Sequence, residues 1–166
     1  MFDIRKAVPK DALGITIVNV YTWKTTYPGL MPDEVIDSRI AELIEKAEKC
    51  RIDIEQNDNF FIAVIGHTII GFCCYGISRN KKYNASGEIY ALYVLKGCQG
   101  LGVGKALFSA GTNALKDRGY SSIIINCLYG NPSLGFYQHM GGKIISQKKD
   151  DIKDKSIIED ILYFEI

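Results

Sequence analysis

The residues best suited to chemistry lie between Glu88 and Lys105, where a run of strand-forming residues is followed by closely spaced glycines. Gly100, Gly102 and Gly104 stand at every second position just before a helical pattern begins. Glycine leaves no side chain between the backbone and a ligand, and the N–H groups at a helix N-terminus attract anions. This arrangement predicts a binding site for a phosphate or pyrophosphate group.

The spacing of this turn excludes the two best-known phosphate-binding loops. A P-loop has a glycine five residues before its Gly-Lys pair and Ser or Thr after it, but Gln99 and Ala106 occupy those positions here. A dinucleotide-binding fingerprint has its third glycine where Lys105 stands, and an acidic residue about 20 positions later. A different type of phosphate-binding turn is therefore expected.

Three stretches together resemble one known family. The pattern Gln99-x-x-Gly102-x-Gly104 after a hydrophobic strand is similar to motif A of the GCN5-related N-acetyltransferase (GNAT) superfamily, which reads Arg or Gln, two residues, Gly, one residue, then Gly or Ala. The stretch that runs from Asn131 through Phe136-Tyr137 to Gly142 resembles motif B. A Trp23…Tyr27-x-Gly-Leu-x-Pro stretch is similar to one found between the first two helices of one branch. The resemblance covers nearly the whole chain.

The resemblance implies that acetyl-coenzyme A (acetyl-CoA) is the cosubstrate and that an amine is the acceptor. The backbone N–H groups from Gly100 to Lys105 would hold the pyrophosphate. The edge of the preceding strand would pair with the pantetheine arm, and the N–H of Val94 would bind the acetyl carbonyl. The coenzyme-binding residues implied in this way are Leu92, Tyr93, Val94, Gln99, Gly100, Leu101, Gly102, Val103, Gly104, Lys105, Asn131 and Tyr137. The alternative for the glycines is a tight turn that binds no ligand.

The resemblance also implies two catalytic residues. Tyr137 stands where the family has a tyrosine whose hydroxyl protonates the leaving coenzyme sulfur, and a phenol with a pKa of about 10 is protonated at neutral pH. Glu88 stands eleven residues before Gln99, as does the general base of the histone acetyltransferase branch. In a regular strand Glu88, Tyr90, Leu92 and Val94 share one face, which would put the carboxylate in line with the site.

Each of these residues also has a purely structural interpretation. Tyr137 is alternatively a packed helix aromatic, and Glu88 an acidic residue at the wet end of a strand. Trp23 and Tyr27 are placed by the resemblance in the acceptor pocket, although core packing explains them equally well.

Composition limits the number of domains and the kinds of partner, compartment and metal site that we expect. The chain has 166 residues, 47% of them apolar, and a formal net charge of +1, which fits one domain spanning residues 1–166. Near-neutral charge gives no long-range attraction to nucleic acid, and we expect no membrane partner because no apolar run approaches about 20 residues. The five cysteines are an odd number without metal-ligand spacing, so we expect a cytoplasmic protein with reduced thiols and no bound metal.

The periodicity predicts a mixed α/β chain, and the resemblance supplies its architecture. It implies the GNAT fold, a central mixed and mostly antiparallel sheet flanked by helices. We expect helices between Asp11 and Tyr27, after Asp33, from Val103 to Arg118 and from Asn131 to Met140. The first should bury Leu13, Ile17, Val20 and Tyr21, and the second Ile36, Ile40, Leu43 and Ile44. We expect strands at residues 2–8, 60–65, 68–75, 88–95, 122–128, 143–147 and 157–166, with a charged turn at 148–155.

The sequence thus predicts an N-acetyltransferase in which a primary amine attacks acetyl-CoA directly, in a ternary complex. The acceptor is a small-molecule amine or a protein amine, and a homodimer is possible. Two alternatives from other classes remain: a non-catalytic acyl-CoA sensor, which would bind the coenzyme without turnover, and an assembly subunit with the same fold, which would not bind it.

Overall fold

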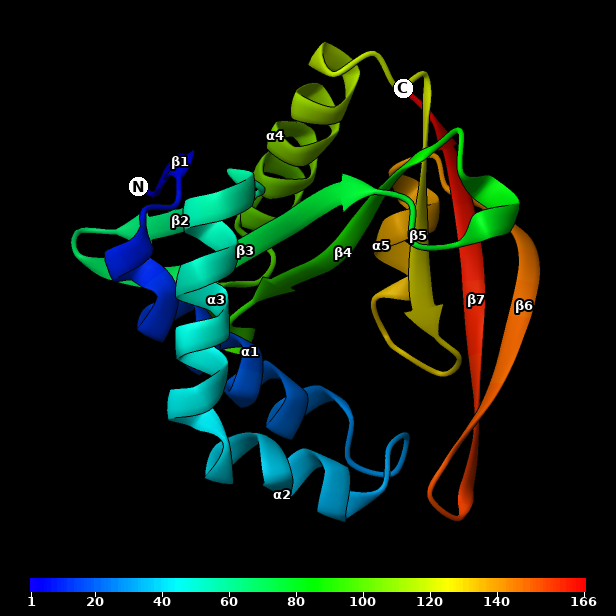
Figure 1. Cartoon of the computed structure of the whole chain (residues 1–166), viewed down its shortest axis with the longest axis horizontal. Coiled ribbons are helices and arrows are strands. Elements are labelled where there is room, and N and C mark those ends of the chain that lie inside the picture. The colour runs from blue at the N-terminus through cyan, green and yellow to red at the C-terminus, as the bar shows by residue number, and fades with distance from the viewer.

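The centre of the molecule is a seven-stranded sheet (Figure 1), described by a computed structural model that covers residues 1–166. The strand order is β1-β2-β3-β4-β5-β7-β6, and every neighbouring pair is antiparallel except β4 and β5. This confirms the predicted mixed and mostly antiparallel sheet. The strands are β1 (Asp3–Lys6), β2 (Phe60–Ile65), β3 (Thr68–Ile77), β4 (Gly87–Val94), β5 (Ser122–Leu128), β6 (Lys143–Ile152) and β7 (Lys155–Glu165).

Helices cover both faces of the sheet, and each face has its own apolar core. On one face α4 contributes Val103, Leu107 and Leu115 to a cluster that includes β5 and α5 residues. On the other face α1 and α3 pack on β2 and β3 in a second cluster. Both faces of the central strands are therefore buried. The helices are α1 (Ala12–Thr26), α2 (Asp33–Ala41), α3 (Leu43–Asn57), α4 (Val103–Asp117) and α5 (Leu134–His139), and none is both long and apolar enough to cross a bilayer.

Of the four residues that were predicted to form the buried face of α1, only Val20 is buried. Leu13, Ile17 and Tyr21 are exposed, whereas Ile15 and Val18 enter the core. Because this helix is apolar around much of its circumference, periodicity alone does not indicate the face that packs on the sheet.

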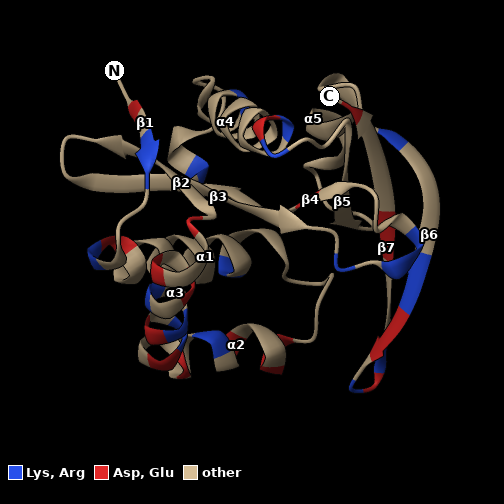
Figure 2. Ribbon diagram, turned by 45° about the horizontal axis from the view of Figure 1, so that its top comes forward, with Lys and Arg blue, Asp and Glu red and all other residues tan.

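The segment after Asp33 forms two helices where one was predicted. The chain breaks at Glu42, whose φ of −94° and ψ of 12° end α2 and begin α3 in a new direction (Figure 1). Of the predicted face only Ile36 is buried, while Ile40 and Ile44 are exposed. The charged face of α3 is solvated as expected, with alternating basic and acidic residues along it (Figure 2). The break turns the helix so that Ile54, further along α3, is the residue that reaches the core.

The last two strands are longer than predicted. Residues 148–155 were expected to form a charged turn, but β6 and β7 pair almost to the tip of the hairpin, where Lys153 has a φ of +53°. Backbone hydrogen bonds form a ladder whatever the side chains are, and the charged side chains here point into solvent. The hairpin tip reaches the loop after α1, where Lys155 Nζ donates to the carbonyl oxygen of Gly29 over 2.5 Å.

Strands β4 and β5 separate soon after they meet. They pair only at Gly87 with Ile123 and at Glu88 with Ile124. Beyond these pairs the two strands diverge, so the edges of both are free of a strand partner in the middle of the sheet (Figure 1). Backbone groups that lack a ladder partner need another one, which makes this opening the natural place for a ligand.

Candidate active site

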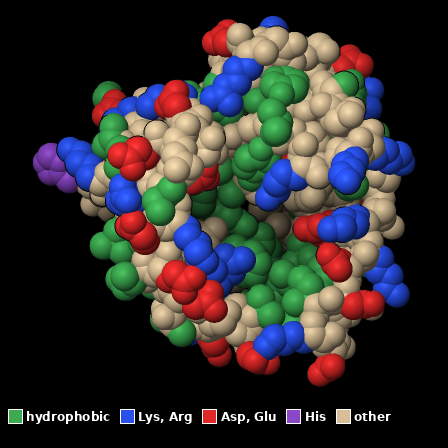
Figure 3. Space-filling model, in the orientation of Figure 1, with side chains coloured by type: hydrophobic (Ala, Val, Ile, Leu, Met, Phe, Trp, Pro, Cys, Tyr) green, Lys and Arg blue, Asp and Glu red, His purple; other side chains and the backbone are tan.

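Two hollows meet at the opening between β4 and β5. The first, which we call the cleft, lies between these strands and α1, and holds about 60 Å³. The second, the glycine-turn hollow, lies beside the turn that precedes α4 and holds about 680 Å³. Tyr137, Val94 and Gln99 line both of them. The space-filling view shows a depression near the middle of one face, walled mostly by hydrophobic side chains with Lys and Arg at its rim (Figure 3).

The glycine turn has the geometry of an anion cradle. Gly100 and Gly102 have φ of +77° and +82°, and a Cβ atom added to either would meet no other atom within 4 Å. Helix α4 begins at Val103 without a side-chain cap. Its first N–H groups therefore lack intrahelical partners and open toward the hollow, beside the ammonium groups of Lys96 and Lys105. These residues fit the pyrophosphate of a coenzyme.

The edge of β4 that faces the cleft offers free backbone groups. The N–H of Leu95 donates to the carbonyl oxygen of Ile70, which makes Val94 and Gly71 a non-hydrogen-bonded pair with β3. The N–H and C=O of Val94 consequently point away from β3, toward the opening. Gln99 Nε2 donates to that carbonyl oxygen over 3.1 Å, and the N–H faces the region where β5 has moved away. This edge fits an amide-bearing chain such as pantetheine.

Tyr137 lies where the two hollows meet. It is a residue of α5, only 8% exposed, and lines both. Burial raises the pKa of its hydroxyl above the ordinary value of 10.0, and the nearby Cys127, Tyr93 and Cys73 raise it further. The hydroxyl is therefore protonated at neutral pH and able to donate a proton at this position.

A cluster of aromatic residues forms the α1 side of the cleft. Trp23 Nε1 donates to the Tyr93 hydroxyl over 3.1 Å, and the Tyr27 hydroxyl lies 3.3 Å from the same oxygen. The guanidinium of Arg39 stacks on Trp23, 3.2 Å from the ring centroid. Tyr27 and Tyr93 line the cleft, whereas Trp23 stands behind them and fixes the position of Tyr93.

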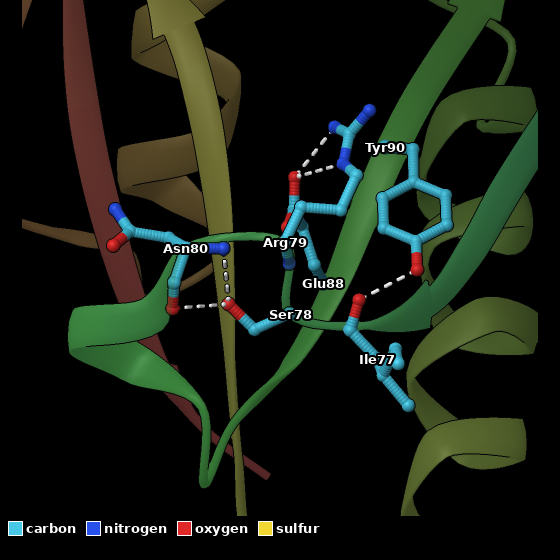
Figure 4. Close-up of polar contacts among 6 residues, drawn as sticks. All are labelled: Ile77, Ser78, Arg79, Asn80, Glu88 and Tyr90. Atoms are coloured by element: carbon cyan, nitrogen blue, oxygen red, sulfur yellow. Dashed lines mark hydrogen bonds and ion pairs between the residues drawn. The ribbon is translucent and has the colours of Figure 1, made fainter.

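Glu88 is buried in an ion pair (Figure 4). Its carboxylate accepts hydrogen bonds from Arg79 Nη2 at 2.6 Å, from Arg79 Nε at 3.1 Å and from the backbone N–H of Arg79 at 2.7 Å. The side chain is 1% exposed and lines neither hollow. Glu88 thus anchors the loop after β3 in this conformation.

A β-bulge in β4 explains why Glu88 is not in line with the site. Ala91 pairs with Cys74 and Ile89 pairs with Tyr75, so Tyr90 is an extra residue in β4. The predicted shared face is therefore wrong: Leu92 packs toward α4, whereas Tyr90 packs toward α1. The Tyr90 hydroxyl donates to the carbonyl oxygen of Ile77 over 2.5 Å (Figure 4), which stabilises the bulge.

The remaining predicted residues differ in their surroundings. Leu101 is 62% exposed and Val103 is 1% exposed, so their side chains line neither hollow and only their backbone groups belong to the turn. Asn131 lines the cleft, and its Oδ1 accepts from the N–H of Ser133 over 2.8 Å.

The sequence analysis missed Thr22 and Asn126, which also line the cleft. A polar residue within the apolar run Ile123-Ile124-Ile125-Asn126-Cys127 was the available signal. No group of His, Cys, Asp and Glu is placed to hold a metal ion.

Comparison with known proteins agrees with this geometry. Residues 20–142 match the model of the acetyltransferase (GNAT) family. The chain is 28% identical, over 92% of its length and 86% of the relative, to an uncharacterized N-acetyltransferase of Bacillus subtilis, YuaI. It is also 28% identical, over 86% of its length and 88% of the relative, to spermidine N(1)-acetyltransferase of Thermoplasma acidophilum.

Solved structures show the same fold. PaiA N-acetyltransferase of T. acidophilum, in complex with coenzyme A, superposes with a TM-score of 0.74 at 24% identity, over 96% of this chain and 98% of that one. A GCN5-related N-acetyltransferase from Rhodopseudomonas palustris superposes with a TM-score of 0.76 at 15% identity, over 99% and 95% of the two chains. With the family match over most of the chain, these likenesses establish that the protein belongs to the acetyltransferase (GNAT) family.

Proposed function

We propose that this acetyl-CoA-dependent N-acetyltransferase transfers the acetyl group to a primary amine by direct attack, in a complex that holds both substrates. The observation that carries the proposal is the meeting of two hollows at Tyr137. The coenzyme occupies the glycine-turn hollow, the acceptor enters the cleft, and the two meet at the opening between β4 and β5.

The chain's own backbone holds the coenzyme in this proposal. The N–H groups from Gly100 to Lys105 bind the pyrophosphate, and the Leu92–Val94 edge of β4 binds the pantetheine arm. The bound coenzyme supplies an activated thioester carbonyl at the opening. The N–H of Val94 donates to the carbonyl oxygen, which stabilises the charge that develops there during attack.

Tyr137 is the general acid. Its buried hydroxyl retains its proton at neutral pH and gives it to the departing sulfur. Ser133 lines both hollows and Cys127 lines the cleft, but neither side chain has a hydrogen bond to a basic group that would activate it as a nucleophile, so the amine itself attacks. Glu88 as general base stays a prediction, since base catalysis by this carboxylate requires its contact with Arg79 to open or a path through water.

The acceptor class is a primary amine. One relative is named for acetylation of spermidine, which supports small amines as the first acceptors to test. Release of coenzyme thiol from acetyl-CoA should be measured across spermidine, tyramine, glucosamine and a peptide with a free α-amine. Initial rates with both substrates varied should give intersecting double-reciprocal lines. Binding of acetyl-CoA without release from any amine would contradict the proposed activity, and parallel lines would contradict direct attack.

A further inference from the structure

Two buried polar atoms without partners belong to residues that line the cleft. The protein has four buried side-chain polar atoms that lack a hydrogen-bond partner, and two of them are Thr22 Oγ1 and Asn126 Oδ1. Both residues line the cleft. Buried polar groups in folded proteins are almost always hydrogen-bonded, so each exception calls for an explanation such as an absent ligand.

The positions of these two residues indicate which substrate they serve. Thr22 belongs to α1 and is 6% exposed, and Asn126 belongs to β5, paired with Ile161 of β7. Both line the cleft, and neither lines the glycine-turn hollow. The group that satisfies them therefore binds in the cleft, away from the pyrophosphate turn, and the acceptor, which enters through the cleft in the proposed function, can supply it.

The chemistry of the lining indicates the form of that group. No aspartate or glutamate lines either hollow, and apart from the Cys127 thiol the polar side chains of the cleft are hydroxyls and amides. An ammonium that leaves water without an anionic partner is strongly disfavoured relative to the neutral amine. A neutral primary amine has two N–H donors and one lone pair, and hydroxyl and amide oxygens accept from such donors.

We propose that Thr22 Oγ1 and Asn126 Oδ1 accept the two N–H groups of the acceptor's neutral primary amine, which leaves the lone pair free for the acetyl carbonyl. This assignment rests on the proposed function. In the reaction the nitrogen bonds to the acetyl carbon and the carbon–sulfur bond breaks, while the proton lost by nitrogen balances the one gained by sulfur. A secondary amine has a single N–H group and is bound less well.

The test uses the near-isosteric variants Thr22→Val and Asn126→Leu. The control is Thr16→Val, because Thr16 is a buried threonine of the same helix whose Oγ1 does have a partner, the carbonyl oxygen of Ala12 at 2.8 Å. Each cleft variant should raise the KM of the acceptor about fivefold to tenfold, the loss expected for one hydrogen bond between neutral groups. The preference for the primary amine over its N-methyl derivative should shrink in both.

Stability and coenzyme binding complete the test. Removing an unpartnered buried polar atom should keep or raise the Tm in both cleft variants, and leave the Kd of acetyl-CoA within about twofold. The control should lower the Tm and keep the acceptor KM. The acceptor is whichever of spermidine, tyramine, glucosamine and the free-amine peptide the wild-type enzyme acetylates fastest.

Three outcomes would overturn the assignment while leaving the proposed function intact: an unchanged acceptor KM in both cleft variants, a weakened affinity for acetyl-CoA, or a Tm that falls as it does in the control. A wild-type enzyme that acetylates none of the four amines would overturn the proposed function, and this assignment with it.

Discussion

Substitution of Gly102 by alanine should separate coenzyme binding from folding. Gly102 has a φ of +82°, and an added Cβ would meet no protein atom within 4 Å. The folded protein should therefore lose only the backbone strain of a left-handed alanine, about 1–2 kcal/mol. In a protein of this size the Tm should fall by roughly 2–8 °C. The methyl group would occupy the space in which the pyrophosphate approaches the N–H groups.

The matched control is Gly119→Ala. Gly119 follows the other end of α4, has a φ of +92°, and likewise has no atom within 4 Å of an added Cβ. Both variants should lose the same stability, measured by thermal unfolding without ligand. Only Gly102→Ala should weaken the binding of acetyl-CoA, by about 10-fold or more. It disturbs hydrogen bonds to a charged group, and such bonds contribute about 1.5–3 kcal/mol.

Isothermal titration calorimetry with acetyl-CoA gives the deciding comparison. A Kd that rises only in Gly102→Ala confirms the turn as the pyrophosphate site. If Gly102→Ala leaves the Kd within about twofold of the wild type, or if Gly119→Ala weakens binding equally, the reasoning is refuted.

Three further changes test other parts of the account. Tyr137→Phe should lower kcat about 100-fold or more and change the Kd of acetyl-CoA much less. Because burial raises the pKa of this hydroxyl, its ionisation should cause no falling limb in the wild-type kcat profile up to about pH 10. Glu88→Gln should abolish the rising limb of the pH–rate profile if this carboxylate is the base. An unaltered limb together with a lower Tm would show that Glu88 has a structural role only, through its contact with Arg79. Hydrogen bonds from Arg5 hold the pKa of Asp11 below its ordinary value of 3.8, so this pair stabilises the fold fully above that pH, and the stabilisation is lost progressively as the pH falls through the lowered pKa. Asp11→Asn should accordingly lower the Tm at pH 7, and the loss should shrink as the pH falls below 3.8; a loss that does not change with pH would exclude the ion pair as the cause.

The sequence indicated the backbone part of the site well. Gly100 and Gly102 adopt conformations that other residues rarely adopt, so their presence before a helix already described the shape of the turn. Tyr137 was likewise found from its motif, and the structure places it at the meeting point of the two hollows.

Features that depend on tertiary contacts were not accessible from sequence. The bulge at Tyr90 results from pairing with β3, and one extra residue is enough to move Glu88 to the other face of the strand. The buried face of α1 was mispredicted for a similar reason. Leu13 and Ile17 are as apolar as Ile15 and Val18, and only contact with the sheet distinguishes them. Asn126 differed from its sequence neighbours only as a polar residue in an apolar run, and the lack of hydrogen-bond partners at Thr22 and Asn126 is a property of the folded protein.

The most direct test of acetyl transfer by direct attack is a single turnover. Enzyme in excess over acetyl-CoA would be mixed with the best acceptor and quenched at intervals, and both protein and amine analysed by mass spectrometry. The account predicts that the acetyl group appears on the amine at every time point while the mass of the protein stays unchanged. An acetylated protein that forms first and decays as the acetylated amine appears would contradict it.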